Sequence, residues 1–203
     1  MEKGKTSEIA TFLRTVQEVR EALRGEGPVS EERLRAWIQV AHRVRDGWLY
    51  VQLAQLLIRH RPHDPAWAPV VVGWLLEAAQ RRSLWMDHLV YWALRGWPAA
   101  LLHSAIPLMC IQFHPRGFAE GLWKALQAGV LRPEAVPATW LEYLVKVSEN
   151  RPAGDRAVVR QVLEAIQKSE PSARVSAASP ELADASPNRL RAEARPQIGW
   201  AAV

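Results

Sequence analysis

The chain has 203 residues, of which 49% are hydrophobic and 23% are charged, and its formal net charge at pH 7 is +5. These values are typical of a globular protein with a core large enough for one ordinary domain. The single cysteine, Cys110, excludes an intramolecular disulfide and a cysteine zinc cluster, which fits a cytoplasmic location.

The N-terminal part of the sequence predicts three helices. In the first, apolar residues at helical spacing predict a buried stripe of Ile9, Leu13, Val16 and Leu23. We expect Gly25 to end this helix in the left-handed conformation and Ser30 to cap a second helix that stops at Asp46-Gly47. A third helix is expected from about residue 48 to 60. Its one polar face is marked by Gln52, Gln55 and Arg59.

The next stretch, residues 67–95, has four tryptophans spaced seven, eleven and seven residues apart, which puts them on nearly one side of a helix. Residues 69–95 allow two interpretations. They could form one long helix, because no proline interrupts them beyond Pro69, or they could form a hairpin of two helices. In the hairpin, Arg81-Arg82-Ser83 forms the turn and Ser83 caps the second helix. We favour the hairpin, since both halves are apolar on more than one side.

No Lys, Arg, Asp or Glu occurs between Gly96 and Pro115, a length that would suffice for a membrane span. Pro107 would interrupt a spanning helix, so we expect two buried helices near 98–106 and 107–113 and no membrane partner. Further helices are expected over 116–128, after Pro133, after Pro137, and from Asp155 onward.

Together these elements predict an all-α fold. About ten short helices in antiparallel hairpins occupy residues 6–169, as a compact bundle or as a short α-α superhelix. Residues 170–203 are rich in Ser, Ala and Pro and predict a disordered tail. The final segment, 196–203, carries the apolar residues Ile198, Trp200 and Val203 and is a candidate docking motif.

Tryptophan is unusually frequent, with ten residues in the chain. Most are expected in the core because they lie among apolar neighbours at helical spacing: Trp37, Trp74, Trp85, Trp92, Trp123 and Trp140. Trp48, Trp67 and Trp97 each lie beside a turn residue at a helix end. We therefore expect these three, with Trp200, to face solvent and to dock a protein partner.

A basic segment precedes and includes the third helix. Its arginines are Arg33, Arg35, Arg43, Arg45, Arg59 and Arg61, accompanied by one acid, Asp46. With Arg81 and Arg82 they form a candidate patch for a nucleic acid or an acidic protein. The alternative is an ordinary solvated face. If nucleic acid binds here, we expect phosphate contacts without base recognition.

Candidate chemistry is sparse. Two groupings resemble partial metal sites: His60, His63 and Asp64 on a helix-end loop, and His103, Cys110 and His114. Asp87-His88 could orient a base, but sequence neighbours on a helix do not face each other. We therefore expect no metal, no cofactor and no catalytic residue.

These observations predict a non-enzymatic interaction or scaffold subunit of a larger assembly, which binds a protein partner. The alternative is an accessory nucleic-acid-binding subunit that contacts phosphates. The oligomeric state is left open.

Overall fold

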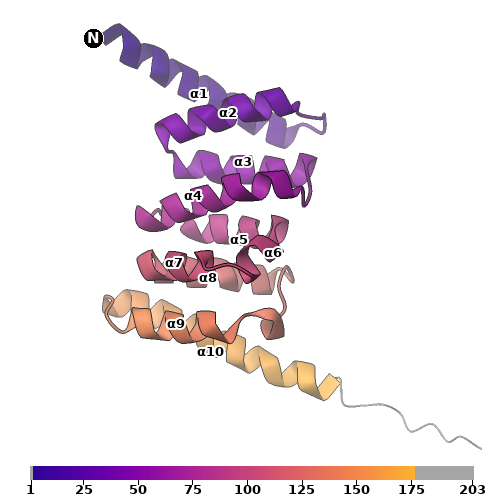
Figure 1. Ribbon diagram of the computed structural model, residues 1–203, viewed down its shortest axis with the longest axis vertical. Coiled ribbons are helices and arrows are strands. Elements are labelled where there is room, and N and C mark those ends of the chain that lie inside the picture. The colour runs from indigo at the N-terminus through magenta and orange to yellow at the C-terminus, as the bar shows by residue number, and fades with distance from the viewer. Residues whose placement is uncertain (1, 177–203) are drawn as a thin grey trace, which may run out of the picture.

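In the computed structural model, the chain folds into two rows of antiparallel helices that are stacked along one axis (Figure 1). The structure describes the backbone of residues 2–176 and the side chains of residues 7–168. The elements are α1 (Glu2–Arg24), α2 (Glu31–Val44), α3 (Gly47–His60), η1 (Pro65–Trp67), α4 (Ala68–Gln80), α5 (Met86–Gly96), α6 (Pro98–Leu102), α7 (Ile106–Phe113), α8 (Pro115–Gln127), η2 (Pro133–Ala135), α9 (Ala138–Ser148) and α10 (Ala153–Ser176). No strand occurs within residues 2–176, which confirms the all-α prediction.

The helices pack in series. In the first row α1 contacts α3, α3 contacts α5, α5 contacts α8, and α8 contacts α10. In the second row α4 contacts α7 and α7 contacts α9, whereas α2 packs on α1 and α3. The short α6 contacts α5 and α7. α1 and α10 therefore lie at opposite ends of the stack, which favours the superhelix over the compact bundle (Figure 1).

Capping side chains set the first helix boundaries. The Ser30 hydroxyl accepts a hydrogen bond from the Arg33 amide at 3.3 Å, as expected for an N-cap. Asp46 caps α3 in the same way by accepting from the Leu49 amide at 2.7 Å. α1 ends at Arg24, just before Gly25, as expected, but the left-handed conformation expected for Gly25 is wrong, since among the described glycines only Gly129 has a positive φ, of 66°. The guanidinium of Arg59 instead donates to the carbonyl of Gly25 at 3.1 Å.

The hairpin predicted for residues 69–95 is confirmed, because α4 ends at Gln80 and α5 begins at Met86. The expectation that Ser83 caps the second helix is wrong, since Trp85 is the N-cap residue of α5 and no side chain caps this helix. Arg82 takes the left-handed conformation with a φ of 52°. The Ser83 amide donates to the Ala78 carbonyl at 2.9 Å, and the Arg82 amide donates to the Ala79 carbonyl at 3.1 Å. These two bonds are the Schellman arrangement, here built on an arginine instead of a glycine.

The uncharged stretch after Gly96 forms two short helices, as expected, although α6 already ends at Leu102. Pro107 lies buried in the first turn of α7, where its missing amide hydrogen costs nothing. Among the described residues, no helix has both the length and the apolar character that crossing a membrane requires.

The C-terminal boundary differs from expectation, because α10 continues to Ser176, past residue 169. The rest of the proposed tail lies outside the described residues. This includes the candidate docking motif 196–203 with Ile198, Trp200 and Val203.

The core runs continuously through the stack, and its largest fully buried side chains include Trp74, Tyr50 and Phe118. At its centre α8 approaches α5 closely: a Cβ added to Gly121 would lie 2.5 Å from the Asp87 carbonyl oxygen. At the N-terminal end the predicted stripe is partly wrong, since Ile9 and Leu13 are each 60% exposed. α1 has a first-row neighbour on one side only, so part of its apolar surface remains uncovered.

Candidate functional site

The helix-end tryptophans do not behave alike. Trp67 and Trp97 are only 4% and 6% exposed, so the expectation that they face solvent is wrong. The indole of Trp97 donates to the Asp64 carbonyl at 2.7 Å, across 33 residues of sequence. The Arg35 guanidinium lies 5.1 Å from the centre of the Trp67 ring. In both cases a residue about thirty positions earlier in the chain contacts the indole, which a sequence pattern does not reveal.

Trp48 remains half-buried and belongs to an aromatic cluster with Trp85 and His88. The ring centres of Trp48 and Trp85 are 4.5 Å apart, and His88 lies 5.9 Å from Trp85. Trp85 was expected in the core but is 37% exposed, because it precedes the first turn of α5. The cluster therefore presents indole surface to solvent at the junction of α3 and α5.

Two adjoining hollows lie next to this cluster, and His88 lines the first of them. The first hollow, of about 460 Å³, is lined by Gln55, His88, Tyr91, Trp92, Lys124, Gln127 and Ala128. The second, of about 510 Å³, is lined by Asp87, Glu120, Trp123, Lys124, Gln127, Val158, Gln161, Val162 and Ala165. They share Lys124 and Gln127, so together with the Trp48–Trp85 pair they form one surface across α3, α5, α8 and α10. We call this surface the aromatic groove.

Helical spacing explains why these side chains share one side. Residues 88, 91 and 92 of α5 are three and four positions apart, as are residues 120, 123, 124 and 127 of α8. The intervening positions are apolar or small and pack on the neighbouring helices, as Val90 and Gly121 do. Trp92 and Trp123, expected in the core, are instead half-buried and line the hollows.

The electrostatic centre of the aromatic groove is Lys124. Its ammonium group donates to a carboxylate oxygen of Asp87 and lies 3.4 Å from the Nε2 atom of His88. The Asp87 side chain is 13% exposed, and its other oxygen is buried without a hydrogen-bond partner among the described residues. Asp87 and His88, which are neighbours in the sequence, therefore both contact Lys124 of another helix, and the His88 Nε2 atom lies 3.9 Å from the same Asp87 oxygen.

This arrangement supports binding more readily than covalent chemistry. An ammonium group has three donors, so Lys124 keeps donors for an anionic ligand after it has bonded to Asp87. Cys110, the single cysteine of the chain, is fully buried, and burial raises the pKa of its thiol to about 12. A thiol of this kind is inert at neutral pH.

The basic patch predicted from the sequence is divided in the structure. Arg33 and Arg35 lie in the first two turns of α2, whereas Arg43 and Arg45 lie at its last turn and C-cap. At 1.5 Å per residue, the two pairs are separated by about 15 Å. Arg45 and Arg81 both approach Glu77, at 3.8 Å and 3.3 Å. Arg45 and Arg81 therefore lie together near the C-terminal end of α4, away from Arg33 and Arg35.

Arg59 and Arg61 are engaged in hydrogen bonds to backbone carbonyl groups. Arg59 donates to the Leu23 carbonyl at 2.6 Å, and Arg61 donates to the His60 carbonyl at 3.2 Å. Many basic side chains lie at helix C-termini, where the carbonyl groups favour positive charge. Helix termination therefore accounts for much of the positive charge that looked like a binding patch in the sequence.

The two partial metal groupings do not assemble into a site. Asp64 caps η1 by accepting from the Ala66 amide at 3.0 Å. His114 caps α8, where its Nδ1 atom accepts from the Gly117 amide at 3.1 Å. Within the described residues, no group of three or more His, Cys, Asp or Glu side chains could hold a metal ion.

Tyr91, Lys124 and Gln127 were not predicted from the sequence as members of a site. A usable signal was present, because Trp92, Lys124 and Gln127 interrupt the apolar stripes of their helices with polar or amphipathic side chains. No family model, no curated protein and no solved structure matches this chain, so the aromatic groove is assigned from its own geometry.

Proposed function

We propose that the protein is a non-enzymatic interaction subunit that binds a segment of another polypeptide in the aromatic groove. One observation carries the proposal: the hollow between α5 and α8 places half-buried Tyr91 and Trp92 beside Lys124, whose ammonium group pairs with Asp87 and still reaches solvent. Elongated stacks of helical hairpins commonly bind extended partners along one open side.

The chemistry of the groove indicates which segment it fits. Tryptophan and tyrosine offer large, rigid apolar surfaces and are enriched at binding hot spots. Lys124 is 39% exposed and can receive a carboxylate from the partner. The fitting segment therefore carries an apolar or aromatic side chain next to an Asp or Glu.

A displayed library of random peptides, selected on the full chain, tests this proposal. We expect enrichment of peptides that pair an acid with an apolar anchor. Their affinity should fall by roughly tenfold or more in Trp92→Ala and in Lys124→Ala. Met109→Ala is the matched control, because Met109 is 44% exposed on α7, outside the groove. Enriched peptides that bind all variants equally would refute the assignment of the site.

The alternative function is nucleic-acid binding through phosphate contacts, and it needs a separate binding measurement. Fluorescence anisotropy with labelled single- and double-stranded DNA and RNA at two salt concentrations would measure it. The variant for this arm replaces Arg43, Arg45, Arg81 and Arg82 with alanine. Salt-sensitive binding that this variant loses, together with no peptide selection, would favour the nucleic-acid role.

A further inference from the structure

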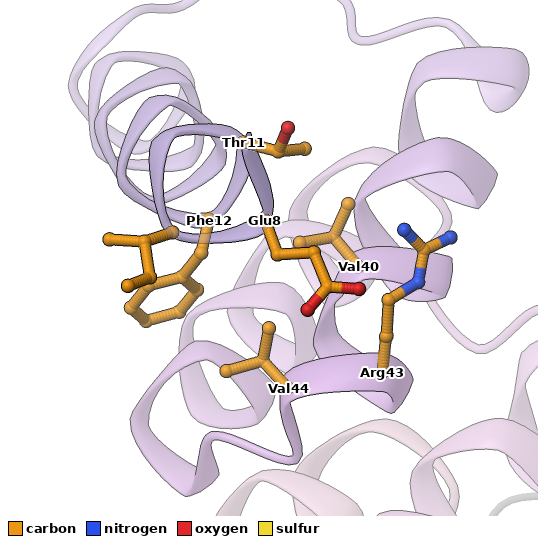
Figure 2. A pocket seen from close by; sticks show the side chains of 7 residues that line it. Glu8, Thr11, Phe12, Val40, Arg43 and Val44 are labelled. Carbon is orange, nitrogen blue, oxygen red and sulfur yellow. The ribbon is translucent and has the colours of Figure 1, made fainter. Parts of the chain in front are cut away.

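The N-terminal end of the stack carries a second surface that the proposed function does not use. A hollow of about 350 Å³ lies between α1 and α2 and is lined by Glu8, Ile9, Thr11, Phe12, Val40, Arg43 and Val44. Figure 2 shows Glu8 and Phe12 of α1 on one side of it and Val40, Arg43 and Val44 of α2 on the other. We call this surface the end groove.

The end groove is apolar where a terminal helix is normally polar. Ile9 is 60% exposed and Val44 is 41% exposed, and Leu13, one helical turn after Ile9, is 60% exposed. Stacks of helical repeats ordinarily need a polar outer face on the last helix to remain soluble. An apolar face at that position is typical of a contact surface.

The charges at the rim indicate what covers this surface. Glu8 and Arg43 stand on opposite sides of the hollow and carry opposite charges (Figure 2). Within the part of the chain that the structure describes, neither side chain has an ion-pair partner. A surface with one acid and one base flanking an apolar strip is complementary to its own copy turned through a two-fold axis.

We infer that the end groove is the interface of a two-fold symmetric homodimer. In this dimer the exposed apolar residues Ile9, Leu13 and Val44 form an apolar strip on each copy, and the two strips pack against each other. Glu8 of one copy then pairs with Arg43 of its partner, and the reverse pair forms at the same time. The aromatic grooves of both copies remain open, because they lie on α3, α5, α8 and α10.

Sedimentation velocity over a range of protein concentrations tests the inference. The wild-type mass should rise with concentration from the monomer value of 22.9 kDa towards twice that value. Leu13→Asp should remain monomeric throughout that range, because it places a charge on the apolar strip. Val145→Asp is the matched control: Val145 is 46% exposed on α9, near the other end of the stack, and its change should leave the dimer intact.

A charge-reversal series separates the two-fold pairing from other contacts. Glu8→Arg alone and Arg43→Glu alone should each weaken dimerisation by roughly five- to tenfold, because each places like charges together twice. The double variant restores the opposite charges and should recover near wild-type dimerisation. Far-ultraviolet circular dichroism checks that each variant is folded. A wild-type chain that is monomeric at every concentration would overturn the inference, and so would a dimer that is insensitive to Leu13→Asp or a double variant without recovery.

Discussion

The centre of the stack and its N-terminal end are built from similar amphipathic helices but bury them to very different degrees. At the centre, α5 and α8 approach so closely that Gly121 leaves no room for a Cβ atom. At the end, Ile9 and Leu13 of α1 are each 60% exposed. A helix with neighbours on both sides buries most of its circumference, whereas a terminal helix buries one stripe. Position in the stack therefore decides how much an apolar residue contributes to stability.

A pair of phenylalanines tests this difference with the largest expected effect. Phe118 is fully buried and meets Trp140 edge-to-face at 5.5 Å, so Phe118→Ala should lower the free energy of unfolding by about 3–5 kcal/mol. Phe12→Ala, in the half-buried end groove, should cost less than half as much. Urea denaturation followed by circular dichroism measures both. Equal losses would show that the two regions are buried alike in solution.

The close approach of α5 and α8 predicts a smaller loss. Gly121→Ala would place a Cβ 2.5 Å from both the Asp87 carbonyl oxygen and the Val90 Cβ, and should destabilise the protein by about 1–3 kcal/mol. Gly73 on α4 has no atom within 4 Å of such a Cβ, so Gly73→Ala should stabilise by about 0.5–1 kcal/mol. Thermal unfolding of the two variants should therefore shift in opposite directions.

The helix cap at the centre of the stack, His114, can be protonated, whereas the cap of α2 near the N-terminal end, Ser30, cannot. Burial is the main cause that lowers the pKa of His114 below its ordinary value of 6.5, and its Nδ1 atom accepts a hydrogen bond at the start of α8. The unfolded chain therefore binds a proton more readily, and stability should fall as the pH drops below about 6.5. This loss should level off below the folded pKa. Ser30, the cap of α2, does not titrate in this range.

His114→Asn keeps a capping side chain and removes the titrating group. Urea denaturation at pH 7.5 and 5.5 should then show a smaller loss of stability than in the wild type. Some dependence should persist, because burial and the neighbouring Arg59 and Arg61 also lower the pKa of His60. His103→Asn, at an exposed position, is the control. An unchanged pH dependence in His114→Asn would contradict the prediction.

The smallest effect is expected at the exposed end. Leu13→Ser should change the free energy of unfolding of the monomer by no more than about 0.5 kcal/mol, because Leu13 is mostly solvated. Denaturation at a concentration low enough to keep the chain monomeric measures this. A loss of several kcal/mol would mean that Leu13 is covered within a single chain.

The sequence was most informative where local chemistry decides the structure. Ser30 and Asp46 mark helix starts because their side chains bond to nearby amides. The all-α class and the hairpin at residues 81–83 follow from periodicity and composition. The left-handed residue of that turn is Arg82, which propensity does not favour.

The exposure of the tryptophans and the aromatic groove could not be predicted from the sequence, because both depend on packing between distant segments. The Trp97 indole is bonded to a carbonyl 33 residues away in the sequence, and Trp85 is exposed because it lies just before the first turn of α5. The aromatic groove joins Asp87 to Lys124 from two helices that touch only in the folded chain. Periodicity assigns a residue to one face of its own helix, but it does not say which helix, if any, lies against that face.

The serial order of contacts, in which each helix packs mainly on its near neighbours, also bears on how the chain folds. Few contacts join the two ends, so folding needs little closure of long loops and can begin in any hairpin and spread. Hydrogen exchange should accordingly be fastest in α1 and slowest in α5 and α8, with the ends opening without the centre. A partner bound in the aromatic groove would protect the slow region, whereas pairing at the end groove would slow the opening of α1.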